Sequence, residues 1–163
     1  SQNLPVAIGE VGLDYHYQPY NRGAQIKLLE QMLQLAKDHD LLLSFHVREA
    51  FDDFFAVIEN FPDIRGVGHS FSDSPENLEK AIKKDFYIGV NGLATFTSIP
   101  IPPLERTLLE TDAPFLTPKP NRGKINEPGY VKHIAQYLSN KTGVSLAEIA
   151  EKTTQNARRI FRI

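Results

Sequence analysis

Four side chains of types that commonly bind metal ions each stand at the end of a short apolar segment. They are Glu10, His46, His69 and Asp112. Short apolar runs bounded by turn residues are typical of buried strands, and the carboxyl ends of parallel barrel strands meet at one face. We therefore expect these four side chains to converge. Glutamate, histidine and aspartate together suit hard to borderline divalent cations, and the sequence leaves Mg²⁺, Mn²⁺ and Zn²⁺ open.

Each of these residues, taken alone, also has an ordinary structural explanation. Acids at strand ends often belong to turns, which the proline at position 114 favours for Asp112. A lone histidine at a strand end is more often a hydrogen-bonded structural residue than a ligand. Two such histidines, His46 and His69, at the ends of successive predicted strands favour the ligand interpretation.

In a metal site, two of the carboxylates would have further roles. Asp112 could bind a cation and also accept a proton from a bound water molecule, which makes it a candidate catalytic base. Glu10 has two carboxylate oxygens and could bridge two cations. Gly9 and Gly12 stand on either side of it and let the backbone turn tightly beside a ligand.

Three basic residues are candidates for binding an anionic substrate. Arg48 lies two residues after His46, so both project from the same side of the strand, and its guanidinium could hold an anionic oxygen. Arg122 and Lys124 flank a glycine in the loop after Asp112 and could contact phosphate. A strand-end arginine packed over the histidine and a solvated basic loop are the alternatives.

An aromatic loop follows the first predicted strand. Tyr15, Tyr17 and Tyr20 lie within six residues and could stack on a nucleic-acid base, or could form a lid packed on the barrel mouth. Three further histidines, at positions 16, 39 and 133, do not follow apolar strand-like segments. We expect the last two to be surface residues of helices.

The composition is that of an ordinary soluble domain. The 163 residues are 41% hydrophobic and 23% charged, so the chain can bury one sizeable core. The formal charge of −2 gives no global basic field for nucleic acid, so a polyanion would have to be bound locally or through a metal. No apolar run is long enough to span a membrane. The chain contains no cysteine, which fits a reducing cytoplasm.

Strand-like and helical patterns alternate along the chain, which predicts an α/β fold with a parallel sheet. We expect five strands, at residues 6–8, 41–45, 66–71, 86–90 and 107–111. We expect helices at residues 25–38, 50–60, 74–84 and 130–140, a short helix opened by Ser145, and a last helix at 154–161. Ser74 and Ser145 have the sequence context of N-caps.

The length is short for a complete barrel. An eight-stranded βα barrel takes about 250 residues and at least about 200, so we expect residues 1–163 to form one domain with about five of the eight strands. The stretch between the last two strands, residues 91–106, contains three prolines and leaves little room for a crossover helix. We therefore expect residues to be missing near positions 98–102.

Taken in order, these motifs resemble the TatD family of metal-dependent hydrolases and deoxyribonucleases. The resemblance rests on the segments at residues 8–14, 45–48, 68–71, 109–114 and 122–128, and on the last helix with Asn156 and Phe161. It covers nearly the whole chain. The five segments are individually weak, but their occurrence in this order is a specific signal.

The resemblance implies a TIM-type barrel of the amidohydrolase-like superfamily that hydrolyses phosphodiesters, often in DNA, with divalent metal. It implies that Glu10 ligates and bridges two metal ions, that His46 and His69 are ligands, and that Asp112 is a ligand and the base for the attacking water. The family's first strand carries a His-x-His pair that is absent here. The chain is therefore expected to correspond to the C-terminal portion of the family's barrel.

The sequence thus predicts a metal-dependent phosphodiesterase with two divalent ions and a DNA substrate, single-stranded or bound at its ends. Hydrolysis of a small amide, lactone or phosphoester at the same kind of site is an alternative, because one barrel supports many chemistries. A non-catalytic binding domain is the alternative from another class. Cleavage of oligonucleotides but not of small esters would separate the first two.

Overall fold

Strands and helices alternate along residues 5–163, the part of the chain that the computed structural model describes. The strands of this part are β1 (Ala7–Asp14), β2 (Leu42–Arg48), β3 (Gly66–Gly68), β4 (Tyr87–Val90) and β5 (Thr107–Leu109). The α-helices are α1 (Arg22–His39), α2 (Phe51–Ile58), α3 (Pro75–Lys83), α4 (Val131–Thr142) and α5 (Leu146–Phe161). Three short 3-10 turns complete the order: η1 (Gly92–Thr95), η2 (Leu104–Arg106) and η3 (Pro128–Tyr130).

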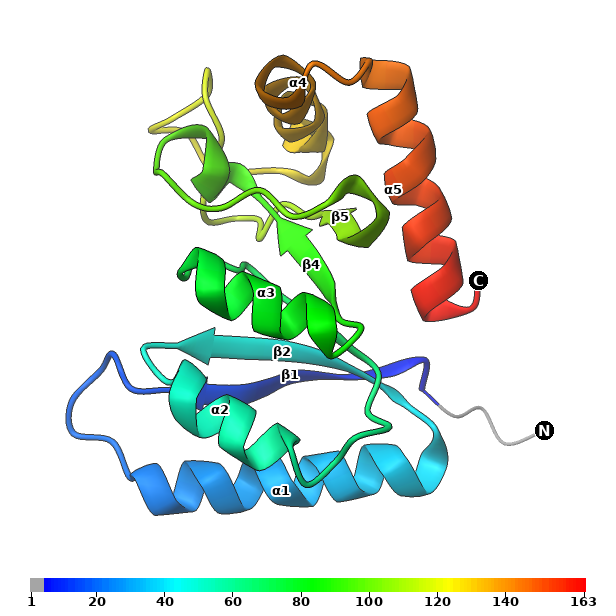
Figure 1. The fold of residues 1–163 in the computed structure, drawn as a ribbon. Helices are drawn as coiled ribbons and strands as arrows, with labels where there is room; N and C mark the ends of the chain where they lie inside the picture. The colour runs from blue at the N-terminus through cyan, green and yellow to red at the C-terminus, as the bar shows by residue number, and fades with distance from the viewer. Residues whose placement is uncertain (1–4) are drawn as a thin grey trace.

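The five strands form one parallel sheet in the order β1-β2-β3-β4-β5. Helices α1, α2 and α3 cover one face of its first half, and α4 and α5 lie beside its other end (Figure 1). This alternating, all-parallel arrangement confirms the predicted α/β barrel-type fold. Within the described residues the sheet is not closed, because β1 and β5 are its edges.

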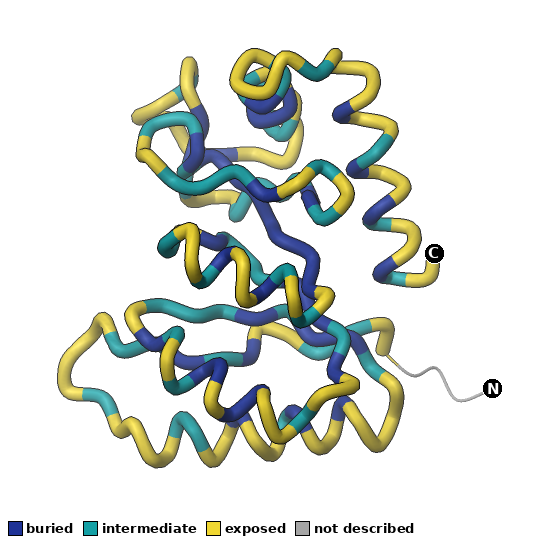
Figure 2. Tube along the Cα trace, viewed as in Figure 1, coloured by how far each residue is buried: buried dark blue, intermediate teal, exposed yellow. Residues whose placement is uncertain are grey.

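Both faces of the sheet are buried, and successive residues of β2 point alternately into two different hydrophobic clusters. Leu43 and Phe45 enter a large core with Leu29 and Leu33 of α1, and all four are at most 1% exposed. Leu42, on the opposite face, joins a second cluster of strand side chains that packs against α5. Figure 2 shows the buried path along the strands. Because strand side chains alternate, the face that holds Leu42 also holds His46.

The helix starts follow the predicted capping chemistry. The Ser74 side chain accepts a hydrogen bond from the backbone N–H of Asn77, and Pro75 occupies the first turn. The Ser145 side chain accepts from the backbone N–H of Glu148. Both N-cap predictions are confirmed, since each serine satisfies a backbone donor that the helix leaves free.

Several predicted boundaries were wrong: β3 ends at Gly68 instead of position 71, β5 ends at Leu109 instead of position 111, and α1 begins at Arg22 instead of position 25. The short helix after Ser145 and the helix at 154–161 are a single helix, α5, because Thr153 does not interrupt it: its hydroxyl donates to the Ile149 carbonyl at 2.8 Å. The first strand runs to Asp14 instead of ending at position 8. Its second half pairs with β2 as far as Arg48, although a glycine stands at position 12.

The connection between β4 and β5 contains no α-helix, as the prolines predicted, yet the two strands are parallel. Turns η1 and η2 carry the chain back instead. The buried Asn156 of α5 fixes the return, because its side-chain amide donates to the carbonyls of Leu104 and Thr107 at 2.8 Å each. The 16 residues at 91–106 therefore reach from one strand to its neighbour, and the expectation of missing residues near 98–102 stays a prediction.

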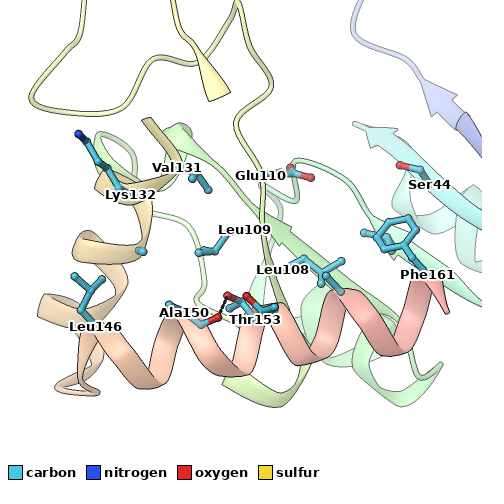
Figure 3. Close-up of a pocket in the computed structure, with 14 residues that line it drawn as sticks. Ser44, Leu108, Leu109, Glu110, Val131, Lys132, Leu146, Ala150, Thr153 and Phe161 are labelled. Carbon is cyan, nitrogen blue, oxygen red and sulfur yellow. Dashed lines mark hydrogen bonds between the residues drawn. The ribbon is translucent and has the colours of Figure 1, made fainter. Parts of the chain in front are cut away.

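An apolar groove of about 580 Å³ lies between one face of the sheet and helices α4 and α5, and its lining extends from Ser44 of β2 and Val67 of β3 to β5 (Figure 3). Leu108 and Leu109 form its floor. Helix α5 contributes one wall, with Leu146, Ala150 and Phe161 spaced to share a face of the helix. None of the helices described here has the length and apolarity to cross a membrane.

The amide of Asn156 yields a stability prediction. Replacing Asn156 by Ala should lower the free energy of unfolding by about 2–4 kcal/mol, because two buried carbonyls lose their donors. Urea denaturation measures the change. Gln155→Ala is the matched control on the same helix, where an exposed side chain should change stability by less than about 0.5 kcal/mol. Equal effects at the two positions would contradict the role given to Asn156.

Candidate active site

The structure brings the four predicted ligands together at the carboxyl ends of the strands. One ring nitrogen of each of two histidines faces the Glu10 carboxylate. His46 Nδ1 lies 3.6 Å from Glu10 Oε2, and His69 Nε2 lies 3.6 Å from Glu10 Oε1. His69 Nε2 also lies 3.5 Å from Asp112 Oδ1. The convergence expected from the sequence is therefore present in the fold.

Glu10 reaches the histidines because β1 is irregular at this point. The pairing with β2 shifts between Ile8 and Val11, so that Gly9 and Glu10 together stand opposite a single residue of β2. A bulge of this kind changes the direction of a side chain without ending the strand. A Cβ at Gly9 would lie 2.8 Å from the Ser44 Cβ, so the close approach of the two strands requires glycine.

Gly12, two residues after Glu10, also lets β1 approach β2 closely. A Cβ there would lie 1.8 Å from the His46 carbonyl oxygen, which no side chain tolerates. Beyond it, Asp14 Oδ2 lies 3.2 Å from His46 Nε2. The two strands thus hold His46 between Glu10 on one ring nitrogen and Asp14 on the other.

His69 is oriented by the partly buried carboxylate of Glu110, whose role the sequence left undecided. Its Nδ1 lies 2.9 Å from Glu110 Oε2, and the other carboxylate oxygen accepts a hydrogen bond from the Ser70 backbone N–H at 2.6 Å. The Glu110 hydrogen bond is the main cause that raises the pKa of His69 to about 9. Gly89 leaves room for this carboxylate, since a Cβ there would lie 2.3 Å from Glu110 Oε2.

Asp112 sits in a loop that is held by a buried amide. Asn126 Nδ2 donates to the carbonyls of Thr111 and Phe115, at 2.6 and 2.5 Å, and so fixes the chain on both sides of Asp112. Asp112 itself has a φ of +57°, a conformation that aspartate tolerates better than most residues. Burial raises the pKa of its carboxyl group, as expected for a group that can take up a proton.

The residues present suit a divalent cation in type and position. With Nδ1 of His69 directed at Glu110, its Nε2 is left facing Glu10 and Asp112, which is how metal-binding histidines are commonly oriented. Ligands about 2.1 Å from a tetrahedral ion lie about 3.4 Å apart, close to the 3.5 and 3.6 Å found around His69 Nε2. Within residues 5–163, no three His, Asp or Glu side chains already form a complete ligand geometry.

A cleft of about 470 Å³ opens directly over these ligands. His46, His69 and Asp112 lie in its wall together with Arg48, whose guanidinium carbon stands 5.3 Å from the centre of the Tyr17 ring. Two aromatic rings project at its rim, since Tyr17 and Phe115 are each 69% exposed. The cleft therefore combines metal-type ligands, one arginine and two exposed rings.

The loop that carries Tyr17 is anchored at both ends. The Tyr15 hydroxyl donates to Asp53 at 2.7 Å, and Arg22 binds the same carboxylate with two nitrogens, which lowers the pKa of Asp53. Tyr15 also stacks on Tyr20, with ring centres 4.6 Å apart. These contacts fix the ends of the loop and leave Tyr17 projecting over the cleft.

Other residues singled out in the sequence lie outside the cleft. Arg122 stands 3.8 Å over the Phe96 ring and donates to the Thr117 carbonyl, and Lys124 is exposed in the same loop. Their role in substrate binding stays a prediction. His39 and His133 are on α1 and α4, as expected. His16 lies 2.6 Å from Glu49 and was not predicted to have a partner.

Three positioning residues, Asp14, Asn91 and Asn126, were missed from the sequence. Asn91 is 2% exposed and donates to the Ser70 hydroxyl at 2.7 Å, and Asn126 is 3% exposed. Both asparagines lie in segments that read as loops, and nothing in the sequence marks them as buried. Asp14 lies in the segment at residues 8–14, but no role was assigned to it because the first strand was predicted to end at position 8.

Comparison with known proteins gives one consistent result. A family model described as TatD related DNase matches residues 1–162. A metal-dependent hydrolase of Bacillus subtilis, YabD, is 39% identical over 97% of this chain and 66% of its own length. The 3'-5' ssDNA/RNA exonuclease TatD of Citrobacter rodentium is 32% identical over 97% of this chain and 65% of its own length.

Solved structures agree with the sequence comparison. The crystal structure of YJJV, a TatD homologue from Escherichia coli K12, has a TM-score of 0.86 and 29% identity, and the match covers 97% of this chain and 64% of that one. This chain therefore spans slightly less than two thirds of the length of the relatives it matches.

Proposed function

Because this chain belongs to the TatD-related DNase family, we propose that the protein is a divalent-metal-dependent phosphodiesterase that hydrolyses DNA. The observation that carries the proposal is the setting of His69. Its Nδ1 is paired with Glu110, and its Nε2 faces the carboxylates of Glu10 and Asp112. Three carboxylates around one imidazole form a site that favours bound cations.

Two ions, Mg²⁺, Mn²⁺ or Zn²⁺, would be held by Glu10, His46, His69 and Asp112, with Glu10 between the two histidines. When bound, they would supply a water molecule of lowered pKa and neutralise phosphate charge. Asp112 accepts the proton of the attacking water, a role that suits a carboxyl whose pKa burial has raised. Glu110 holds the imidazole of His69 in one orientation and does not itself touch substrate.

The same cleft supplies contacts for a nucleic acid. Within the cleft, Arg48 donates to a phosphate oxygen beside the metal ligands. Outside the cleft, Arg122 and Lys124 contact phosphates further along the DNA strand. The exposed rings of Tyr17 and Phe115 stack on unpaired bases, which duplex DNA does not present, so we propose a single-stranded substrate or a strand end.

The composition supports a proposal for the cellular location. We propose the cytoplasm, which suits a chain without cysteine. Cell fractionation tests it, and recovery of the protein in an extracytoplasmic fraction would reject this location.

The catalytic role of Asp112 is tested in the polypeptide that contains this chain. Asp112→Asn should reduce cleavage of a single-stranded oligonucleotide in Mg²⁺ or Mn²⁺ by about 100- to 10,000-fold, because the base that accepts the water's proton is lost. Asp52→Asn, an exposed acid on α2, is the matched control and should retain activity. Unchanged cleavage by Asp112→Asn would reject the mechanism. Hydrolysis of small esters without oligonucleotide cleavage would reject the DNase proposal.

The role proposed for Tyr17 predicts a change in the affinity for single-stranded DNA. Tyr17→Ala should raise the Kd for single-stranded DNA by about 5- to 150-fold, which is the range that loss of one base–aromatic stack produces. Fluorescence anisotropy with the inactive Asp112→Asn background measures binding without cleavage. Leu28→Ala, an exposed apolar residue on α1, is the control. An unchanged Kd for Tyr17→Ala would show that bases do not stack there.

We also propose that residues 1–163 contribute one part of a larger barrel domain. The edge of β5 offers unpaired backbone groups to a further parallel strand, and the apolar groove offers a surface that the side chains of an added segment would cover. The greater length of the relatives supports this. Such a strand would end beside Glu110 and so reach the metal site.

A charge placed in the groove distinguishes a filled groove from an open one. Ala150→Glu should lower the free energy of unfolding by about 1–3 kcal/mol if a strand covers it, because the carboxylate would be buried without a partner. Gln155→Glu, on another face of α5, should change stability by less than about 0.5 kcal/mol. Both variants are measured in the protein as its own cells produce it. If the two variants are equally stable, the groove stays open to water.

A further inference from the structure

A second cleft lies at the opposite end of the sheet from the candidate active site. Its volume is about 450 Å³, and its walls come from the turns that precede β3, β4 and β5 and from the end of α5. Arg65 and His69 stand at the two ends of β3. The three residues of β3 separate them, a distance of four residue steps, so the two sites lie about 13 Å apart through the sheet.

Positive charge is concentrated in this cleft. Its walls contain two acids, Asp63 and Asp85, and five basic residues, which are Arg65, Lys84, Arg106, Arg159 and Arg162. The chain as a whole has a formal charge of −2, so this excess is local. The basic residues come from four separate segments, and only the tertiary fold brings them together.

Two of the guanidinium groups are held in place by the protein itself. Arg65 donates to the Asp40 carbonyl at 2.8 Å and to the Ile160 carbonyl at 3.4 Å. Arg106 pairs with Asp85 and lies over the Tyr87 ring at 5.1 Å. Fixed guanidinium groups lose little conformational entropy when they bind an anion, and their planar forks match phosphate oxygens.

The carboxylates near the cleft do not balance these cations. Asp40 stands behind the wall and is shared by Arg65 at 3.2 Å and Arg162 at 2.6 Å. Lys84 and Arg159 form no ion pair with any residue in the described part of the chain, residues 5–163, although both line the cleft. The negative end of the helix dipole favours bases at the end of α5. That effect does not account for Arg65 and Arg106, which precede strands.

We propose that this cleft is an anion site that binds a phosphate group carrying two negative charges, as inorganic phosphate or as a phosphate monoester such as a mononucleotide. The excess of cations favours a dianion over a singly charged phosphodiester. The basic residues gather around one cleft of about 450 Å³ among short turns, so the site suits one phosphate group better than an extended strand. This proposal stands independently of the reaction at the other end of the sheet.

The test uses the protein freed of metal ions with a chelating resin, which adds no soluble anion, at low ionic strength, which leaves electrostatic binding unscreened. Inorganic phosphate is titrated and followed by calorimetry and by the backbone amide NMR signals. We expect saturable binding that shifts the signals of Lys84, Arg159 and their neighbours. Arg159→Ala should weaken it by about tenfold or more, as loss of a charge-assisted hydrogen bond does.

Arg158→Ala is the matched control, because Arg158 is the exposed neighbour on α5 and does not line the cleft. It should change the Kd by less than about twofold. Lys84→Ala is a second variant on another element and should also weaken binding. Thermal unfolding followed by circular dichroism checks that each variant is folded.

Three results would overturn the proposal. One is the absence of saturable phosphate binding at this cleft. Another is equal weakening by Arg158→Ala and Arg159→Ala, which would mean diffuse attraction to a basic surface. The third is an equal response to an oligonucleotide without a terminal phosphate, which would show that the cleft does not select a dianion.

Discussion

The repulsion among Glu10, Glu110 and Asp112 around the single imidazole of His69 is the constraint on which the candidate active site depends. Three carboxylates around one imidazole favour positive charge at that position. The hydrogen bond to Glu110 is the main reason why the pKa of His69 rises to about 9, and the charges of Glu110, Glu10 and Asp112 act in the same direction. A bound cation would take over the same role and leave Nε2 free as a ligand.

The scaffold meets this constraint with strands that approach unusually closely. Gly12 lies against the His46 carbonyl, and Gly89 leaves the volume that the Glu110 carboxylate fills. Any side chain at these positions would separate the strands or displace the carboxylate. Close packing of the backbone at these glycines therefore contributes to the distances between the ligands, and the Asn126 amide holds the loop that carries Asp112.

The two ends of the sheet differ in charge because different segments meet there. The carboxyl ends of the strands carry the acids and histidines, with Arg48 as the basic residue of that cleft. The opposite end gathers five basic residues from strand starts and helix ends. A net charge near zero for the whole chain thus conceals an acidic face and a basic face, separated by the length of a short strand.

Much of the fold and of the ligand set could be predicted from local sequence. Apolar runs predicted the strands, and serine N-caps predicted where two helices begin. Residue type and position at a strand end predicted the four ligands Glu10, His46, His69 and Asp112. The bulge in β1, the burial of Asn126 and Asn91, the partner of Glu110 and the cleft around Arg159 could not be predicted. Hydrophobic period and side-chain chemistry are properties of neighbouring residues, and the sequence alone determined them. Register, burial of polar groups and the meeting of distant charges depend on contacts between remote segments, and only the tertiary structure decided those.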